Sequence, residues 1–405
     1  MNRFGKILVV SLSIVVFCYA GLGYLLGKSE EDKTYRSLTV YGEVLQNIQD
    51  NYVDEPNLQL VTAGALHGLV ESLDPESAYL SPREYSDYKD KQKNQAKGDV
   101  GLTLSKRYGY IYVVSELPDG PAEKAGIRSG DILEAVRGFA TREMAVEQAD
   151  ILLQGDPGTT VKVGVVRRGQ TEPAEVEITR ANLPTVFVDA DKVTDGVAYI
   201  RLATLDSGAA SDLRQKLQQL PGQGAQKLVL DLRDCADGPI SEGIAAAQLF
   251  LPSGTITTLS GQTVTKQDFE ADPTKVVWHN PVEVLISSTT AGAAEVLAAA
   301  IGENKRGDLV GDHTAGMAAE QKLIPLDDGA ALILTDALYN TPDGKAILDA
   351  GIAPTFEIAP PADDSTDADT AEPPPPLSIG QLPAKDDPAY LKALDLLKGT
   401  TQKAA

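Results

Sequence analysis

The residues of this chain that could do hydrolytic chemistry are few, and they lie between positions 287 and 322. Four consecutive hydroxyl residues, Ser287–Thr290, follow an apolar run, and a hydroxyl becomes a nucleophile only when a neighbouring base takes its proton. His313 could be that base, whereas Lys322 follows Gln321 on a predicted strand and should therefore point to the opposite face. A hydrolase that uses one of these hydroxyls with His313 is one hypothesis.

The sequence shows no cluster of residues with metal-ligand spacing. Its three histidines and two cysteines are scattered along the chain: His67, His279, His313, Cys18 and Cys235. Zinc sites in proteins draw such residues from short, repeated spacings. We therefore expect no metal, no cofactor and no disulfide framework.

Two regions with different periodicity must position any site. Between residues 183 and 358, apolar runs at 196–201, 227–232 and 282–287 alternate with helical patterns at 208–220, 241–250 and 291–301. That alternation predicts an α/β fold with crossover connections and functional loops at the strand ends. Residues 97–182 instead predict a small β-rich module, with strands at 110–114, 161–166 and 174–178 and a helix at 143–153.

The remaining segments are predicted to anchor, support and tether these two regions. Residues 36–96 predict two amphipathic helices and a turn. Residues 359–386 form an acidic, proline-rich linker, and residues 387–405 a short amphipathic helix with a tail. A net charge of -22 argues against nucleic acid as a partner, because such a field repels phosphate.

Residues 1–27 predict a membrane anchor or a signal sequence. Residues 7–26 are a run of 20 residues without a charge, long enough for a helix to cross a bilayer. Arg3 and Lys6 precede this run and acidic residues follow it, which predicts a cytoplasmic N-terminus and an exported, periplasmic bulk. The expectation is thus a single-pass protein of the inner membrane. The alternative is a secreted protein, cleaved near Cys18-Tyr-Ala20.

Three segments together resemble the C-terminal processing peptidases, also called tail-specific proteases. Residues 284–295 read Val-Leu-Ile-Ser-Ser-Thr-Thr-Ala-Gly-Ala-Ala-Glu, and residues 228–238 read Leu-Val-Leu-Asp-Leu-Arg-Asp-Cys-Ala-Asp-Gly. Residues 120–133, Gly-Pro-Ala-Glu-Lys-Ala-Gly-Ile-Arg-Ser-Gly-Asp-Ile-Leu, are similar to the PDZ domain of that family. The resemblance spans about residues 40–358. It implies a PDZ domain at 97–182, inserted before an α/β protease core at 183–358.

The resemblance also shows what this chain lacks. The family has a nucleophilic serine where this chain has Gly292, and an activating lysine where it has Met317. Glu295 and Gln321 are retained as supporting residues, whereas Asp237 takes a position next to Gly238 in the turn that supplies an oxyanion-hole amide. Glycine offers no nucleophile, methionine offers no base, and a carboxylate would repel a developing oxyanion.

A PDZ domain captures the free C-terminus of an extended peptide, and the resemblance places that groove here. The amides around Val100, Gly101 and Leu102 would hold the terminal carboxylate, although Asp99 beside them is electrostatically unfavourable. Three apolar residues spaced along the predicted helix either receive the last side chain or pack the core of the domain. They are Val146, Ala149 and Leu153.

These residues lead to a pseudoprotease hypothesis. The chain would bind polypeptide C-termini through the PDZ groove and act as an adaptor or regulator, with an active envelope protease as one candidate partner. The alternative is an active serine-type endopeptidase with a non-standard or relocated nucleophile. A purely structural protein is the third hypothesis.

Overall fold

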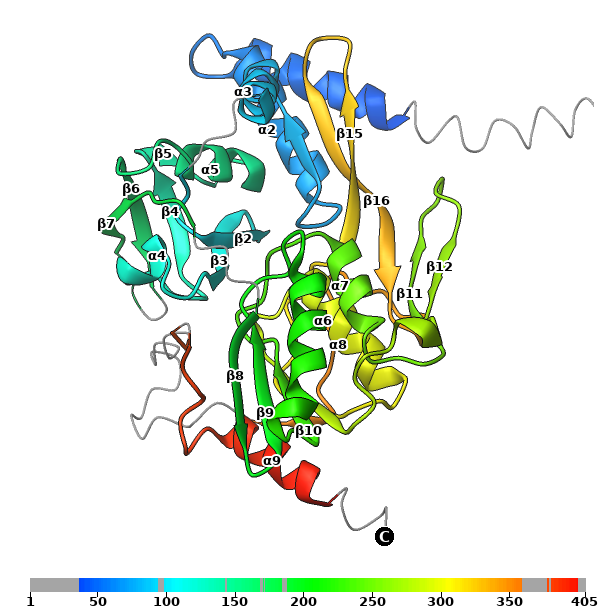
Figure 1. Ribbon diagram of the computed structural model, residues 1–405. Coiled ribbons are helices and arrows are strands. Elements are labelled where there is room, and N and C mark those ends of the chain that lie inside the picture. The colour runs from blue at the N-terminus through cyan, green and yellow to red at the C-terminus, as the bar shows by residue number, and fades with distance from the viewer. Residues whose placement is uncertain are drawn as a thin grey trace, which may run out of the picture. The chain divides into compact units, whose positions relative to one another are not determined.

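The computed structural model describes residues 36–93, 98–142, 144–167, 170, 172–183, 188–358, 377–378 and 380–399 (Figure 1). The predicted anchor at 7–26 and most of the predicted linker lie outside these residues. In the described ranges, no helix is both long and apolar enough to cross a membrane. The anchor therefore stays a prediction from the sequence. The chain divides into two compact units, Met1–Leu66 and His67–Ala405.

The N-terminal region is helical, as its apolar spacing predicts. A helix over residues 36–51 is followed by α2 (Leu58–Glu71), the short strand β1 (Ala78–Leu80) and α3 (Pro82–Lys93). The turn between α2 and β1 is closed by Asp74, whose carboxylate accepts hydrogen bonds from the amides of Glu76 and Ser77. An aspartate that caps its own turn in this way ends a helix and redirects the chain.

Residues 98–183 fold into a small β-rich domain, which we call the small domain. Its sheet has the order β2-β3-β4-β6-β7, with β5 paired to β4. The elements are β2 (Leu102–Arg107), β3 (Tyr110–Glu116), α4 (Pro121–Lys124), β4 (Ile132–Val136), β5 (Phe139–Ala140), α5 (Val146–Leu153), β6 (Thr160–Val166) and β7 (Ala174–Thr179). Strand β2 lies at the edge of this sheet, and α5 packs against it.

Residues 188–358 form an α/β core. Its main sheet has the order β17-β14-β13-β10-β9-β8, in which only β8 is antiparallel to its neighbour. The strands are β8 (Val188–Thr194), β9 (Val197–Leu202), β10 (Lys227–Asp231), β13 (Val282–Ile286), β14 (Leu309–Gly311) and β17 (Phe356–Glu357). The helices between them are α6 (Ala209–Gln219), α7 (Ile240–Ala247) and α8 (Ala293–Glu303). This arrangement confirms the mixed α/β fold class.

Both faces of the main sheet are covered, and the sequence of β10 shows why. Alternate side chains of a strand point to opposite faces, so a strand covered on both sides must be apolar throughout. Leu228 and Leu230 pack into the large core cluster with α6, α7 and α8, whereas Val229 packs on the other face. That second face is covered by α9 (Pro388–Gly399), through Ala389, Ala393 and Leu397.

A second sheet is built mainly from antiparallel strands that alternate in sequence with those of the main sheet. It contains β11 (Thr255–Ser260), β12 (Gln267–Glu270), β15 (Ala319–Pro325) and β16 (Ala331–Asn340). Strand β1 pairs antiparallel with β16, so the segment that precedes the small domain joins a strand that follows α8. The small domain is therefore an insertion between two parts of one fold.

Candidate functional site

Gly292 lies at the junction of β13 and α8, where the chain turns sharply from strand to helix. Its backbone has φ 55° and ψ -115°, a conformation that side-chain-bearing residues rarely adopt. A Cβ atom built on Gly292 would find only the carbonyl oxygen of Ala236, at 4.0 Å. The position thus has a backbone conformation that favours glycine and open space where a side chain would lie.

Glu295 connects the two degenerate positions. Its fully buried carboxylate accepts hydrogen bonds from the amides of Gly292 at 2.9 Å, Met317 at 2.7 Å and Gly316 at 2.7 Å. The hydroxyl of Thr314 donates a fourth bond. Burial raises the pKa of Glu295, and these four donors oppose the rise. The structure therefore brings positions 292 and 317 together around one carboxylate.

The two positions hold no reactive side chain. Met317 is half-buried, and its thioether cannot accept a proton at neutral pH. Gln321 and Lys322 both lie on β15 with exposed side chains, and they pair with successive residues of β16. Successive residues of a strand point to opposite faces, so at most one of the two can face the site.

The turn after β10 carries the second departure from the family. Gly238 has φ 116°, and a Cβ atom there would lie 2.0 Å from the carbonyl oxygen of Leu205, so only glycine fits. The preceding Asp237 accepts a hydrogen bond from the hydroxyl of Thr103, on β2 of the small domain, at 2.9 Å. Although the Asp237 side chain is exposed, the surrounding protein raises its pKa by desolvation, against the bond from Thr103. The carboxyl group thus lies at the turn where the family places an oxyanion-hole amide.

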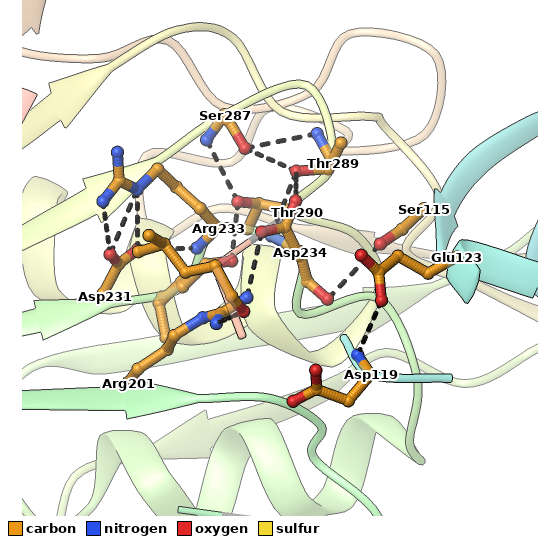
Figure 2. A network of polar contacts seen from close by, with 12 residues as sticks. Ser115, Asp119, Glu123, Arg201, Asp231, Arg233, Asp234, Ser287, Thr289 and Thr290 are labelled. Carbon is orange, nitrogen blue, oxygen red and sulfur yellow. Dashed lines mark hydrogen bonds and ion pairs between the residues drawn. The ribbon is translucent and has the colours of Figure 1, made fainter. Parts of the chain in front are cut away.

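Three of the four hydroxyl residues before Gly292, namely Ser287, Thr289 and Thr290, stabilise the turn (Figure 2). Thr289 donates to Asp234 at 2.9 Å and contacts the hydroxyl of Ser287 at 2.7 Å. Thr290 donates to the carbonyl oxygen of Leu232. Within the described residues these hydroxyls have carboxylate, hydroxyl and backbone partners, and no imidazole or amine is among them. Nothing in this geometry activates them as nucleophiles.

Two further candidates for chemistry are held in unreactive environments. The Asp234 carboxylate forms an ion pair with Arg201 at 3.0 Å, and the Arg201 side chain is almost fully buried (Figure 2). Cys235 is a free, fully buried thiol, and burial raises its pKa, which opposes formation of the thiolate. In the described part of the chain no group of three or more histidine, cysteine or acidic residues is placed to hold a metal ion.

The expected peptide groove would lie between β2 and α5. Some of the residues expected to line it are buried, and others are partly exposed. Ala149 and Leu153 are buried in the hydrophobic core of the small domain, and Val146 packs against that core while partly exposed. Leu102 begins the edge strand. The side chains of Ala149 and Leu153 therefore pack the core of the small domain. Direct contact of either residue with a peptide stays a prediction.

The loop expected to hold a carboxylate is already occupied by the chain itself. The amides of Val100 and Gly101 donate to the carboxylate of Asp99, at 2.6 Å and 3.2 Å. The sequence shows an aspartate at this position but not that its side chain folds back onto the two amides. This contact, and that between Thr103 and Asp237, were not predicted.

Acidic residues are crowded around this region. Burial raises the pKa of Asp150 on α5 to about 7, with further contributions from Glu147, Asp99 and Asp237 that Lys91 opposes. Burial raises the pKa of Glu76 to about 8, and the carboxylates of Glu147, Asp74 and Asp349 add to the effect. Like charges this close favour the protonated form or a cationic ligand.

Comparison with protein families gives two matches along the chain. Residues 98–178 match the PDZ domain, and residues 196–358 match peptidase family S41. The carboxyl-terminal-processing protease of Synechocystis sp. is 30% identical over 360 residues, which cover 87% of this chain and 81% of that protein. The carboxyl-terminal-processing protease of Picosynechococcus sp. is 32% identical, with 80% of this chain and 76% of that protein covered.

A solved structure gives the same result for the fold. The photosystem II D1 C-terminal processing protease superposes with a TM-score of 0.65 and 26% sequence identity. The superposition covers 80% of this chain and 93% of the other. The two chains therefore share their fold over most of their length.

Proposed function

Because the chain belongs to the carboxy-terminal processing proteases of peptidase family S41, we propose that it is a member that binds polypeptides without cleaving them. One observation carries this proposal. Glu295 holds Gly292 and Met317 in one hydrogen-bonded arrangement, and neither position has a group that can attack a carbonyl or accept a proton. The scaffold of a nucleophile and its base is intact, and the chemistry is absent.

A third position, 237, adds to the absence of a nucleophile at position 292 and of a base at position 317. Removal of a nucleophile alone abolishes nearly all covalent catalysis, and what remains comes from the oxyanion hole and substrate binding. Here the oxyanion turn carries Asp237, whose negative charge opposes the charge that develops during acyl transfer. The turn at Asp237 therefore does not support residual catalysis by electrostatic stabilisation of the oxyanion.

The retained function is polypeptide binding. A PDZ groove binds through backbone groups of an edge strand, and β2 is such a strand with α5 beside it. We propose that the groove takes C-terminal or unstructured polypeptide segments, and that the protein acts as an adaptor or regulator of an envelope protease or its substrates. The predicted anchor at 7–26 would hold it in the inner membrane with its bulk in the periplasm.

The test separates binding from cleavage in the full-length chain. Fluorescently labelled casein, an unfolded polypeptide, is incubated with the wild-type chain, with Gly292→Ala and with the double variant Gly292→Ser, Met317→Lys. We expect binding by anisotropy with wild-type chain, and no fragments above the level of Gly292→Ala. Clear turnover by the wild-type chain would establish the alternative, an active endopeptidase with a relocated nucleophile. Absence of both binding and turnover would favour a purely structural protein.

A further inference from the structure

Two hairpin turns of the small domain carry large side chains where such turns usually carry small ones. Two residues separate β2 from β3, and two separate β4 from β5. Turns of this length favour a positive φ at both positions, and Asn-Gly or Asp-Gly is their usual sequence. Here Tyr108 and Gly109 have φ of 53° and 79°, and Arg137 and Gly138 have φ of 54° and 81°. A bulky side chain is disfavoured at positive φ, so folding alone does not account for the tyrosine or the arginine.

Both turns lie at the same end of the sheet. Strands β3 and β4 are antiparallel neighbours, with Ile111 opposite Leu133 and Tyr112 opposite Ile132. The first residues of β3 therefore lie beside the last residues of β4, and each of these strand ends leads into its turn. The turn between β6 and β7 lies at the other end, because Ile132 also pairs with Val166, the last residue of β6.

The end of the sheet that carries the two turns exposes a group of aromatic and cationic side chains, which we call the tip patch. They are Arg107, Tyr108, Tyr110, Arg137, Phe139 and Arg142. The exposed fraction is 96% for Tyr108, 57% for Phe139 and 40% for Tyr110. Large apolar side chains that gather at one place on a protein surface mark a contact with another molecule.

The tip patch is basic, although the chain as a whole is strongly acidic. It holds three arginines in a chain of net charge -22. On strands β2, β3, β4 and β5 the one exposed carboxylate is that of Glu134. On the neighbouring strands, Glu175 and Glu177 are both paired with Lys162. The chain as a whole therefore repels an anionic surface, and this end of the small domain attracts one.

Two of the arginines are positioned by aromatic rings. The guanidinium carbon of Arg142 lies 5.5 Å from the centre of the Tyr110 ring, and that of Arg107 lies 5.7 Å from the centre of the Tyr112 ring. A cation over an aromatic face is held there by the ring quadrupole. A guanidinium group can still bind phosphate oxygens through parallel N–H donors at its edge.

The shape of the tip patch favours a bilayer over a protein partner. A ring that is 96% exposed at the tip of a hairpin, as Tyr108 is, can enter a soft layer of headgroups. A protein partner would instead need a matching pocket to cover the same ring. Arginines beside such rings add attraction to the phosphates of anionic lipids.

We propose that the tip patch docks the small domain on the surface of an anionic phospholipid bilayer. The three arginines bind lipid phosphates, and Tyr108 and Phe139 lie among the headgroups. The predicted anchor at 7–26 would keep this surface within reach, so that docking orients the small domain toward the membrane. Docking is independent of the proposed function, because no residue of the tip patch belongs to the site around Gly292.

The experiment places a fluorescent reporter on the tip patch. Tyr108→Trp is made in the full-length chain, and Gln170→Trp is the matched control, at an exposed position between β6 and β7. The emission of the wild-type chain, whose one tryptophan is the buried Trp278, is subtracted. Each protein is mixed with vesicles of acyl-brominated phosphatidylcholine, with or without phosphatidylglycerol. Vesicle-bound protein is isolated by flotation, and quenching by bromine is measured.

We expect phosphatidylglycerol to increase the quenching of Tyr108→Trp at least about 3-fold, because each arginine near an anionic surface strengthens binding about 5-fold. Quenching of Gln170→Trp should change little. Adding Arg107→Gln, Arg137→Gln and Arg142→Gln to the reporter should remove the increase, and thermal melts without vesicles check that this variant folds. Raising the salt from about 50 mM to about 500 mM should also remove the increase, with no change of sequence.

Two sets of results would overturn docking to anionic lipid. The first is equal quenching of the two reporters, or an increase for Tyr108→Trp that survives both high salt and the loss of the arginines. The second is an emission shift of Tyr108→Trp with polyglutamate and none with vesicles that contain phosphatidylglycerol. That second result would assign the tip patch to an acidic polypeptide instead.

Discussion

The site around Gly292 and the loop at Asp99 differ in opposite ways from what the family resemblance implies. At the first, Glu295 accepts hydrogen bonds from the amides of Gly292 and Met317, and neither position carries the serine or lysine that the resemblance implies. At the second, no side chain of the carboxylate loop was needed for binding, yet an added side chain, that of Asp99, now fills it. A catalytic nucleophile or base is removed by the substitution of one residue. Recognition by backbone amides, in contrast, changes only when another acceptor takes the hydrogen bonds of those amides.

The largest effect is expected at Glu295, on which the first site depends. Glu295→Ala leaves four donors without an acceptor, the buried Gly316 amide and Thr314 hydroxyl and the partly buried amides of Gly292 and Met317. We expect a loss of about 4 kcal/mol in the free energy of unfolding, because unsatisfied buried donors and a new cavity add. Chemical denaturation measures it. Asp99→Ala is the matched change in the groove, and it should cost less, about 2 kcal/mol, because it leaves two donors without an acceptor instead of four. Equal losses would contradict the contrast between the two sites.

The oxyanion turn comes next. Gly238→Ala places a Cβ atom 2.0 Å from the carbonyl oxygen of Leu205, at a φ of 116°. A loss of about 3 kcal/mol is expected from overpacking and strain together. Gly344→Ala is the control, since Gly344 also has a positive φ, 84°, but no atom within 4 Å of a built Cβ. It should cost about 1 kcal/mol. Equal melting temperatures for the two variants would contradict the close approach of position 238 to the carbonyl oxygen of Leu205.

Gly292→Ser should be tolerated. The backbone at φ 55° strains a serine, but the nearest atom to its Cβ is 4.0 Å away. We expect a loss of about 2 kcal/mol in stability and no hydrolysis, because Met317 remains unable to take the proton. A denaturation curve and a casein-cleavage assay measure the two quantities. A loss as large as that of Gly238→Ala would show that the position is not open.

The last prediction concerns the pH profile of stability and not a single stability value, and it is made at Glu76. Its pKa is raised by burial from 4.5 to about 8, so the folded chain holds a proton that the unfolded chain releases near pH 4.5. The stabilising contribution of the protonated form is present below pH 4.5 and is lost as the pH rises toward 8. Glu76→Gln should therefore flatten the stability profile between pH 5 and about 8. Parallel profiles for the two proteins, measured by thermal melts, would contradict the raised pKa.

The strands and helices were largely predictable, because their apolar runs must be buried whatever the tertiary contacts. The run at 227–232 predicts β10, and the helical spacing at 208–220 predicts α6. The family resemblance led to Gly292 and Met317, which no periodicity would have singled out. In α5, periodicity alone could not separate groove from core, and Ala149 and Leu153 proved to be buried.

Two contacts could not be predicted from the sequence. The hydrogen bond between Thr103 and Asp237 joins residues 134 positions apart, so it depends on the docking of two domains. The fold-back of Asp99 onto Val100 and Gly101 is local, but it is a side-chain conformation that the residue types do not determine. The sequence predicts a carboxylate at Asp99 and at Asp237. Only the structure shows which hydrogen-bond donors each carboxylate accepts from.

The most direct test of the account is the wild-type chain's own proteolytic activity. Full-length protein is incubated with casein, and new N-termini are counted by mass spectrometry beside the Gly292→Ala variant and buffer. We expect the three samples to be indistinguishable while casein stays bound. New N-termini produced by the wild-type chain, increasing with time and enzyme concentration, would contradict a binding protein without a nucleophile or base.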